Sequence, residues 1–178
     1  MRKLIIPALL VFCIVQLYFI SSPIIINEDV LKNGKEFNFR IAPVDPEDPF
    51  RGRYVTLTFR DNEIDIAPNE EWQYDEMVFA ELYKAADGYA RIKKLHRERP
   101  PTPDYIKASV AQLSFLNGRK TVFLDLPFDR FYADENKAPL LEEQYRQAVS
   151  DTSSVACVTV CVKNGNAVIK ELVLNSGL

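Results

Sequence analysis

The chain has 178 residues, of which 47% are hydrophobic, and its 22 basic and 25 acidic residues give a formal net charge of −3. This length suits one domain with its own core. Beyond the basic residues at 2 and 3, the chain carries 20 basic and 25 acidic residues. That balance gives no support to nucleic-acid binding or to docking on an anionic membrane surface. Three cysteines form no disulfide framework, so the fold must rely on an apolar core.

The first predicted element is an apolar helix at the N-terminus. Residues 4–20 contain one strongly polar side chain, Gln16, and apolar residues resume at 24–26 after a Ser-Ser-Pro break. About 20 residues of α-helix, rising about 1.5 Å each, cross the hydrocarbon layer of a membrane. Residues 4–26 are therefore long enough to span a lipid bilayer.

Charges on either side of this run predict its orientation. Arg2 and Lys3 precede it and an acidic pair at 28–29 follows it, which favours an N-terminus on the cytoplasmic side by the positive-inside rule. We expect an uncleaved signal-anchor over residues 1–26 and an exported domain over residues 27–178. The expected location is the cytoplasmic (inner) membrane, with the domain in the periplasm if the cell is Gram-negative.

A cleaved signal peptide has the same general pattern of a basic start and an apolar run. We favour a retained anchor because the small-x-small spacing of a cleavage site is poor near the end of the run. The Ser-Ser-Pro junction at 21–23 also places a proline at the expected cut. Cys13 follows the bulky Phe12, which argues against a lipoprotein acylation site and favours a membrane-embedded cysteine.

The exported domain is predicted to begin near the turn signal Asn33-Gly34. Residues 37–41 alternate apolar and polar side chains, which predicts a half-buried strand. Residues 42–59, APVDPEDPFRGRYVTLTF, then place three prolines and a glycine before a second alternating strand at 54–59. Residues 61–71 contain Asp-Asn and Pro-Asn pairs, from which we expect a break in the β structure.

Three hairpins are predicted around turn dipeptides. Asp87-Gly88, Asn117-Gly118 and Asn164-Gly165 supply the positive backbone angles that tight reversals need. The stiff segment 99–103, RPPTP, is expected to be a connector rather than a polyproline ligand. The flanking alternating segments are 77–83 with 89–95, 105–116 with 121–126, and 155–162 with 167–174.

One helix is predicted inside the exported domain, over residues 139–149. It has a proline near its start and Leu141, Tyr145 and Ala148 on one face. The domain is therefore expected to be mainly β, with about eight strands and this one short helix. Frequent hairpin turns favour an antiparallel barrel or sandwich, and the pattern does not choose between the two.

Cysteine and histidine spacing does not indicate a metal site. Cys157 and Cys161 share one face of a predicted strand, where about 13 Å separates them, too far for a disulfide. We expect two buried thiols. His96, the single histidine, lies among lysines and arginines at 93–99 and is expected to belong to a solvated basic edge rather than to a zinc site. No cofactor is predicted.

The loop at 42–53 is the most specific stretch of the chain. Its prolines hold the backbone near polyproline geometry, so the acidic side chains project from a preorganised scaffold. Gly52 permits a bend at the entrance of the following strand. Arg51 or Arg53 is expected to pair with Asp45 or Asp48 through charge-assisted hydrogen bonds. By strand parity, Leu57 and Phe59 face the core, and Tyr54, Thr56 and Thr58 share the other face.

Three explanations of this loop stay open. It is a structural corner, a contact for a partner or ligand, or a metal site formed by Asp45, Glu47 and Asp48. The metal explanation is the least favoured, because hard cations take six or more oxygen ligands and the spacing lacks the glycine turn of a calcium loop.

Residues 52–59, GRYVTLTF, resemble the motif that names the GDYXXLXY family of bacterial membrane-anchored envelope proteins. Residues 127–135 and 167–172 are similar to later blocks of that family, so the likeness covers essentially the whole chain. Arg53 replaces the Asp of the motif, which argues that an acid there is not an indispensable catalytic group, and Phe59 replaces its final Tyr. The resemblance implies an envelope protein of unassigned activity, often encoded beside multi-spanning membrane proteins.

A second candidate segment, 128–135, gathers charged residues before the predicted helix. A carboxylate pair such as Asp129 and Glu135 would do acid-base work only in unlike environments at a cleft. Capping and ion pairing are the favoured roles.

We expect a non-catalytic accessory domain that contacts a multi-spanning membrane protein through these two segments. One alternative is a small-ligand or cation-binding barrel whose mouth is lined by Tyr54, Thr56 and Thr58. Another is a membrane-bound hydrolase that distantly resembles signal peptidases, although the serines near the anchor lack the expected setting. The motif and candidate binding residues are Pro43, Asp45, Asp48, Arg51, Gly52, Tyr54, Leu57, Asp129, Arg130, Tyr132 and Glu135.

Overall fold

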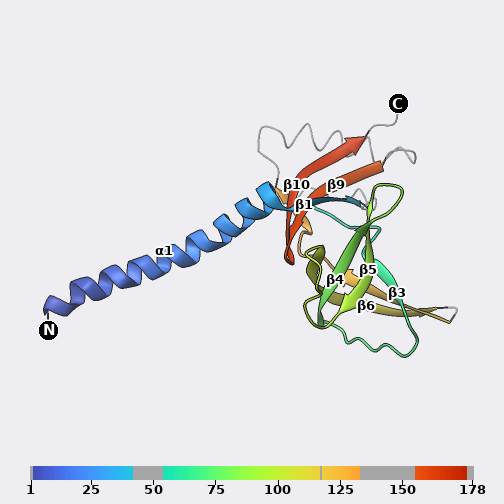
Figure 1. Cartoon of the computed structure of the whole chain (residues 1–178), viewed down its shortest axis with the longest axis horizontal. Coiled ribbons are helices and arrows are strands. Elements are labelled where there is room, and N and C mark those ends of the chain that lie inside the picture. Colours follow the sequence, from blue (N-terminus) through green and yellow to red (C-terminus); the bar gives the residue numbers. More distant parts are fainter. Residues whose placement is uncertain (1, 42–53, 117, 133–154, 176–178) are drawn as a thin grey trace.

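The computed structural model describes residues 2–41, 54–116, 118–132 and 155–175 (Figure 1). Its first element, α1 (Arg2–Asn33), is one continuous helix that projects from the β domain as a single arm. It passes through Pro23 without a break. The helix is long and apolar enough to cross a membrane, and its apolar side chains from Leu9 to Ile26 are exposed.

The arm is joined tightly to the β domain. α1 ends at Asn33 and the first strand begins at Lys35, so in this described stretch only Gly34 separates them. Val30 is buried against the domain. The ammonium group of Lys163 donates to both carboxylate oxygens of Asp29, at 2.9 and 2.7 Å. The C-terminal end of α1 is therefore packed against the sheet rather than joined to it by a flexible linker.

Gly34 is needed at this junction for its size. A Cβ atom there would overlap the carbonyl oxygen of Val30 and lie 3.2 Å from the Cβ of Cys161. We expect Gly34→Ala to lower the free energy of unfolding by about 2 kcal/mol, the scale of overpacking in a tight contact. Thermal unfolding of the full-length chain in detergent measures this.

Gly88→Ala is the matched control. Gly88 has a φ of 83°, and no atom of the described residues lies within 4 Å of a Cβ placed there, so the substitution costs backbone strain alone, about 1 kcal/mol. Equal losses for the two variants would show that Gly34 is not required for close approach.

The β domain contains ten strands among the described residues, arranged in three sheets. All paired strands are antiparallel. One sheet has the order β1 (Lys35–Arg40), β9 (Val155–Lys163), β10 (Asn166–Asn175). A second pairs β2 (Tyr54–Thr56) with β8 (Arg130–Tyr132). The third has the order β3 (Glu63–Ile66), β7 (Arg119–Asp125), β6 (Tyr105–Leu116), β4 (Met77–Lys84), β5 (Ala90–His96).

Isolated bridges join these sheets. Parallel bridges connect Asn38 with Tyr89 and Ile106 with Gly165, and an antiparallel bridge connects Ile41 with Phe59. Together the sheets approach a closed barrel. The predicted mainly β fold with an apolar N-terminal helix is therefore confirmed.

The three predicted hairpins are β4–β5, β6–β7 and β9–β10. Gly88 and Gly118 have positive φ angles of 83° and 78°. Asn164 and Gly165 have φ angles of 52° and 86° and link β9 directly to β10, as a two-residue type I′ turn requires. Asn-Gly and Asp-Gly signals thus located the reversals correctly.

The expected break at 61–71 is wrong in part, because β3 forms at Glu63–Ile66 and pairs with β7. Ile64 and Ile66 pack against the core while Glu63 and Asp65 are exposed. The alternation covers only four residues, and the Asp-Asn and Pro-Asn pairs on either side of it favoured a loop as the prediction. The predicted helix at 139–149 and the loop at 42–53 lie outside the described residues.

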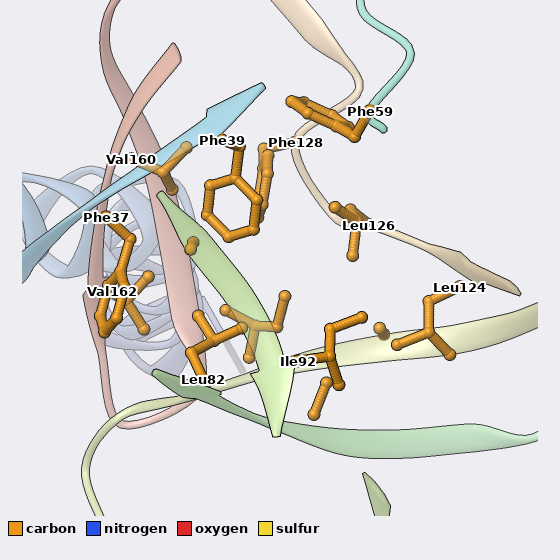
Figure 2. Close-up of a cluster of buried hydrophobic side chains, with 14 of the residues drawn as sticks. Phe37, Phe39, Phe59, Leu82, Ile92, Leu124, Leu126, Phe128, Val160 and Val162 are labelled. Atoms are coloured by element: carbon orange, nitrogen blue, oxygen red, sulfur yellow. The ribbon is translucent and has the colours of Figure 1, made fainter. Parts of the chain in front are cut away.

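The core lies between the sheets and contains a close aromatic cluster (Figure 2). The ring of Phe39 on β1 lies 5.9 Å from that of Phe59 and 5.1 Å from that of Phe128, and the last two are 5.3 Å apart. Leu57 and Phe59 are buried, as strand parity predicted. Cys157 and Cys161 are free and buried, as predicted, and burial raises the pKa of both thiols.

Candidate functional site

The structure brings together the two segments that the sequence analysis singled out. β2 pairs with β8, so Tyr54 lies opposite Tyr132 and Thr56 opposite Arg130. The backbone N–H of Leu57 donates to the carbonyl of Asp129 at 2.7 Å, which extends the pairing. We call residues 54–58 with 129–132 the β2–β8 ribbon.

Charged side chains of the β2–β8 ribbon face solvent. The side chain of Asp129 is 52% exposed and that of Arg130 is 55% exposed, and Arg130 Nε lies 3.6 Å from Asp129 Oδ2. Leu57 of the ribbon and the neighbouring residues Phe59 and Phe128 are buried in the core. Asp129 and Arg130 are therefore exposed charges beside a packed core.

The other candidate residues are not placed by the structure. Pro43, Asp45, Asp48, Arg51, Gly52 and Glu135 lie outside the described residues. Tyr54 and Tyr132 are described only through their backbones, as partners in the ribbon. Among the candidates with described side chains, Asp129 and Arg130 are adjacent and exposed, and Leu57 belongs to the core.

An ionic cluster that no sequence pattern indicated lies around Asp61. Asp61, whose side chain is 6% exposed, accepts two hydrogen bonds from Arg40 at 2.9 and 2.8 Å. Its Oδ2 also lies 2.9 Å from Arg91 Nη1, and Arg91 reaches Asp87 at 2.9 Å. We call Arg40, Asp61 and Arg91 the Asp61 cluster.

The Asp61 cluster joins the first sheet to the five-stranded sheet. Arg40 is the last residue of β1 and Arg91 lies on β5. The pKa of the Arg40 guanidinium is raised above its ordinary value, and the main cause is its hydrogen bonding to Asp61. Charge-assisted hydrogen bonds from two guanidinium groups hold the Asp61 carboxylate in place, which suits a role in fixing the fold.

A hollow of about 580 Å³ lies beside Trp72. The guanidinium of Arg97 lies 4.4 Å from the centre of the Trp72 ring and donates to Glu76 at 2.8 Å. Trp72 is buried, and its Nε1 has no hydrogen-bond partner among the residues that the structure describes. The walls include apolar and charged groups of both signs, namely Glu71, Trp72, Gln73, Glu76, Arg97, Leu113 and Lys120.

The basic edge predicted around His96 lies on β5, an edge strand. Here Glu81 accepts a hydrogen bond from Lys93 at 2.6 Å, and His96 Nε2 lies 3.1 Å from Glu81. His96 is half-buried rather than fully solvated. Within the described ranges, no group of three or more histidine, cysteine or acidic side chains is close enough to hold a metal ion.

Acid is expected to weaken the ion pairs between carboxylates and basic side chains on the five-stranded sheet. The hydrogen bond from Lys93, followed by that from His96, lowers the pKa of Glu81 below its ordinary value of 4.5. The stabilisation is complete above that ordinary pKa and is lost as pH falls through the lower folded-state pKa. We expect the free energy of unfolding to fall from about pH 5 to about pH 3, with Glu81 contributing under about 1 kcal/mol.

Denaturant titrations at several pH values test this expectation. Glu81→Gln should show a shallower loss of stability with acid than the unmodified chain. A pH dependence that is the same in both proteins would contradict the assignment.

Comparison with known proteins assigns the chain to a family. A family model described as "GDYXXLXY protein" matches residues 16–172. Searches of curated proteins and of solved structures found no match. The matched span takes in the second half of α1 and the described β strands up to Leu172 on β10. The chain therefore belongs to the GDYXXLXY family.

Proposed function

We propose that this protein is a membrane-anchored, non-catalytic binding component whose extracytoplasmic β domain contacts a multi-spanning membrane protein. The observation that carries the proposal is the β2–β8 ribbon, which unites the family motif strand with the segment around Asp129. The exposed charges of this ribbon rest on a packed aromatic core. Such a preorganised polar surface loses little conformational entropy on binding.

The junction with α1 limits where the partner can lie. From residue 26 to its end at Asn33 the helix rises about 10 Å. Because Val30 and the Asp29–Lys163 pair hold the helix against the sheet, the domain remains close to the bilayer. Extracytoplasmic loops of a membrane-embedded protein are within reach at that height.

The chemistry of the described side chains supports binding rather than catalysis. Asp61 and Glu81 are engaged in ion pairs with basic side chains. The Cys157 and Cys161 thiols are buried, and their raised pKa keeps them protonated. A thiol is a strong nucleophile only as the thiolate.

Affinity capture from detergent-solubilised membranes tests the proposal. The full-length chain should retain a multi-spanning protein, and the double variant Asp129→Ala with Arg130→Ala should lose most of it. A triple variant at Asp45, Asp48 and Arg51 tests the loop in the same way. Lys94→Ala, an exposed change on β5, is the control. Recovery of no such partner, or equal recovery by every variant, would contradict the proposal.

Ligand binding is a second candidate function, favoured by the hollow at Trp72 and by the unpartnered indole nitrogen. Its location differs from the mouth around Tyr54 that the sequence suggested. Trp72 is the single tryptophan of the chain, so its fluorescence reports on this hollow alone. A ligand that binds the folded state raises its stability. A screen that changes neither the emission nor the melting temperature would count against this function.

A further inference from the structure

Gln16 is a polar residue in an unfavourable place. It lies near the middle of residues 4–26, the apolar run of α1, and its side chain is exposed. Within the described part of the chain, its carboxamide has no hydrogen-bond partner. In the hydrocarbon of a bilayer, an amide without a partner costs several kcal/mol. A membrane-inserted α1 therefore needs a hydrogen-bonding neighbour at this depth.

The carboxamide is complementary to itself, because its oxygen accepts and its NH₂ group donates. Two copies of α1 inserted in the same direction place Gln16 opposite Gln16 across a two-fold axis. Each side chain then donates one hydrogen bond to the other and accepts one in return. An identical helix thus supplies both functions, without a specialised partner sequence.

We infer that α1 forms a parallel homodimer in the membrane through a seam of Leu9, Cys13, Gln16 and Ile20. These residues recur at intervals of four, three and four, the spacing that keeps one helix face against another. All four side chains are exposed. In Figure 1 α1 stands clear of its own β domain over this length, so a second helix can lie along it.

Cys13 lies in the seam, so a disulfide between two copies of Cys13 can report on the dimer. Cys13 is one turn from Gln16 on the same face, so the two Cys13 thiols face each other in the parallel dimer. The other thiols, Cys157 and Cys161, are buried in the β domain. Oxidation of two Cys13 thiols forms one disulfide and passes two protons and two electrons to the oxidant.

The test uses the full-length chain in native membranes, treated with copper phenanthroline in air. The inference rests on the membrane insertion of α1 that the proposed function assumes, and not on the proposed partner. The first assay therefore asks whether the protein stays in the membranes after a carbonate wash. Protein lost in the wash would overturn the insertion itself. With the protein retained, we expect a covalent species of twice the 20.4 kDa chain mass, and Cys13→Ala should abolish it.

Variants at Gln16 and a displaced cysteine make the test specific. Gln16→Leu should lower dimer yield about threefold to tenfold, the range expected for an interhelical hydrogen bond, and Gln16→Asn should keep most of it. Ile14→Cys in the Cys13→Ala chain moves the thiol about 100° around the helix, away from the seam, and should yield little dimer. No dimer from the unmodified chain, equal yield from Gln16→Leu, or an adduct to a different protein would overturn the inference.

Discussion

Asp61→Asn is expected to lower the free energy of unfolding by about 3 kcal/mol. The substitution removes the charge that two guanidinium groups share. It takes this carboxylate from the partly buried Arg40, whereas Arg91 keeps its pair with Asp87. Removing one partner of a buried ion pair strongly lowers the free energy of unfolding, because the charge that remains is poorly solvated. Denaturant unfolding followed by Trp72 fluorescence measures the loss.

Asp87→Asn is the matched control for this prediction. Asp87 bonds the same Arg91, but its side chain is 44% exposed, so its loss should cost under about 1 kcal/mol. Comparable losses for the two substitutions would contradict the structural importance of the Asp61 cluster.

Phe39→Ala is expected to cost about 3 to 5 kcal/mol, the range for emptying a large aromatic site in a core. The ring of Phe39 is fully buried and touches both Phe59 and Phe128. Its removal leaves a cavity where the first sheet, the motif strand and the segment leading to β8 meet. Thermal and denaturant unfolding of the full-length chain give the change.

Phe115→Ala provides the control on the same protein. The side chain of Phe115 is 73% exposed at the β6–β7 hairpin, so its truncation should change stability by under about 0.5 kcal/mol. A loss at Phe39 no larger than that at Phe115 would show that the aromatic cluster does not hold the three segments together.

Local patterns were sufficient to predict much of the fold. Alternation over 37–41 predicted β1, and the Asp-Gly and Asn-Gly pairs predicted all three hairpins, because each signal depends on neighbouring residues alone. The burial of Leu57 and Phe59 followed from strand parity in the same way. The length and apolar character of residues 4–26 likewise anticipated α1.

Contacts between distant residues were not predictable from these patterns. Arg40, Asp61 and Arg91 are far apart in sequence, and each alone has the character of a surface charge. Only the packing of β1 against β5 brings them together. The tight passage from α1 into β1 depends on Gly34 meeting Val30 and Cys161, whereas its sequence signal indicated only a turn.

The candidate site was predicted in part. The sequence singled out residues around 54 and around 129 separately, and their pairing as β2 and β8 depends on a contact across more than seventy residues. Asp45, Asp48 and Arg51 lie outside the described residues, so their expected role in binding stays a prediction. The hollow beside Trp72 had no sequence signal, because its walls come from several separate segments.

Site-specific photocrosslinking tests the central claim most directly, namely that the β2–β8 ribbon is the surface that contacts a membrane-embedded partner. A photoreactive amino acid replaces Asp129 in the full-length chain within living cells, and the same replacement of Lys94 on β5 serves as the control. We predict a covalent adduct to a multi-spanning membrane protein from position 129 and none from position 94. No adduct at position 129, or the same adducts from both positions, would contradict the proposal.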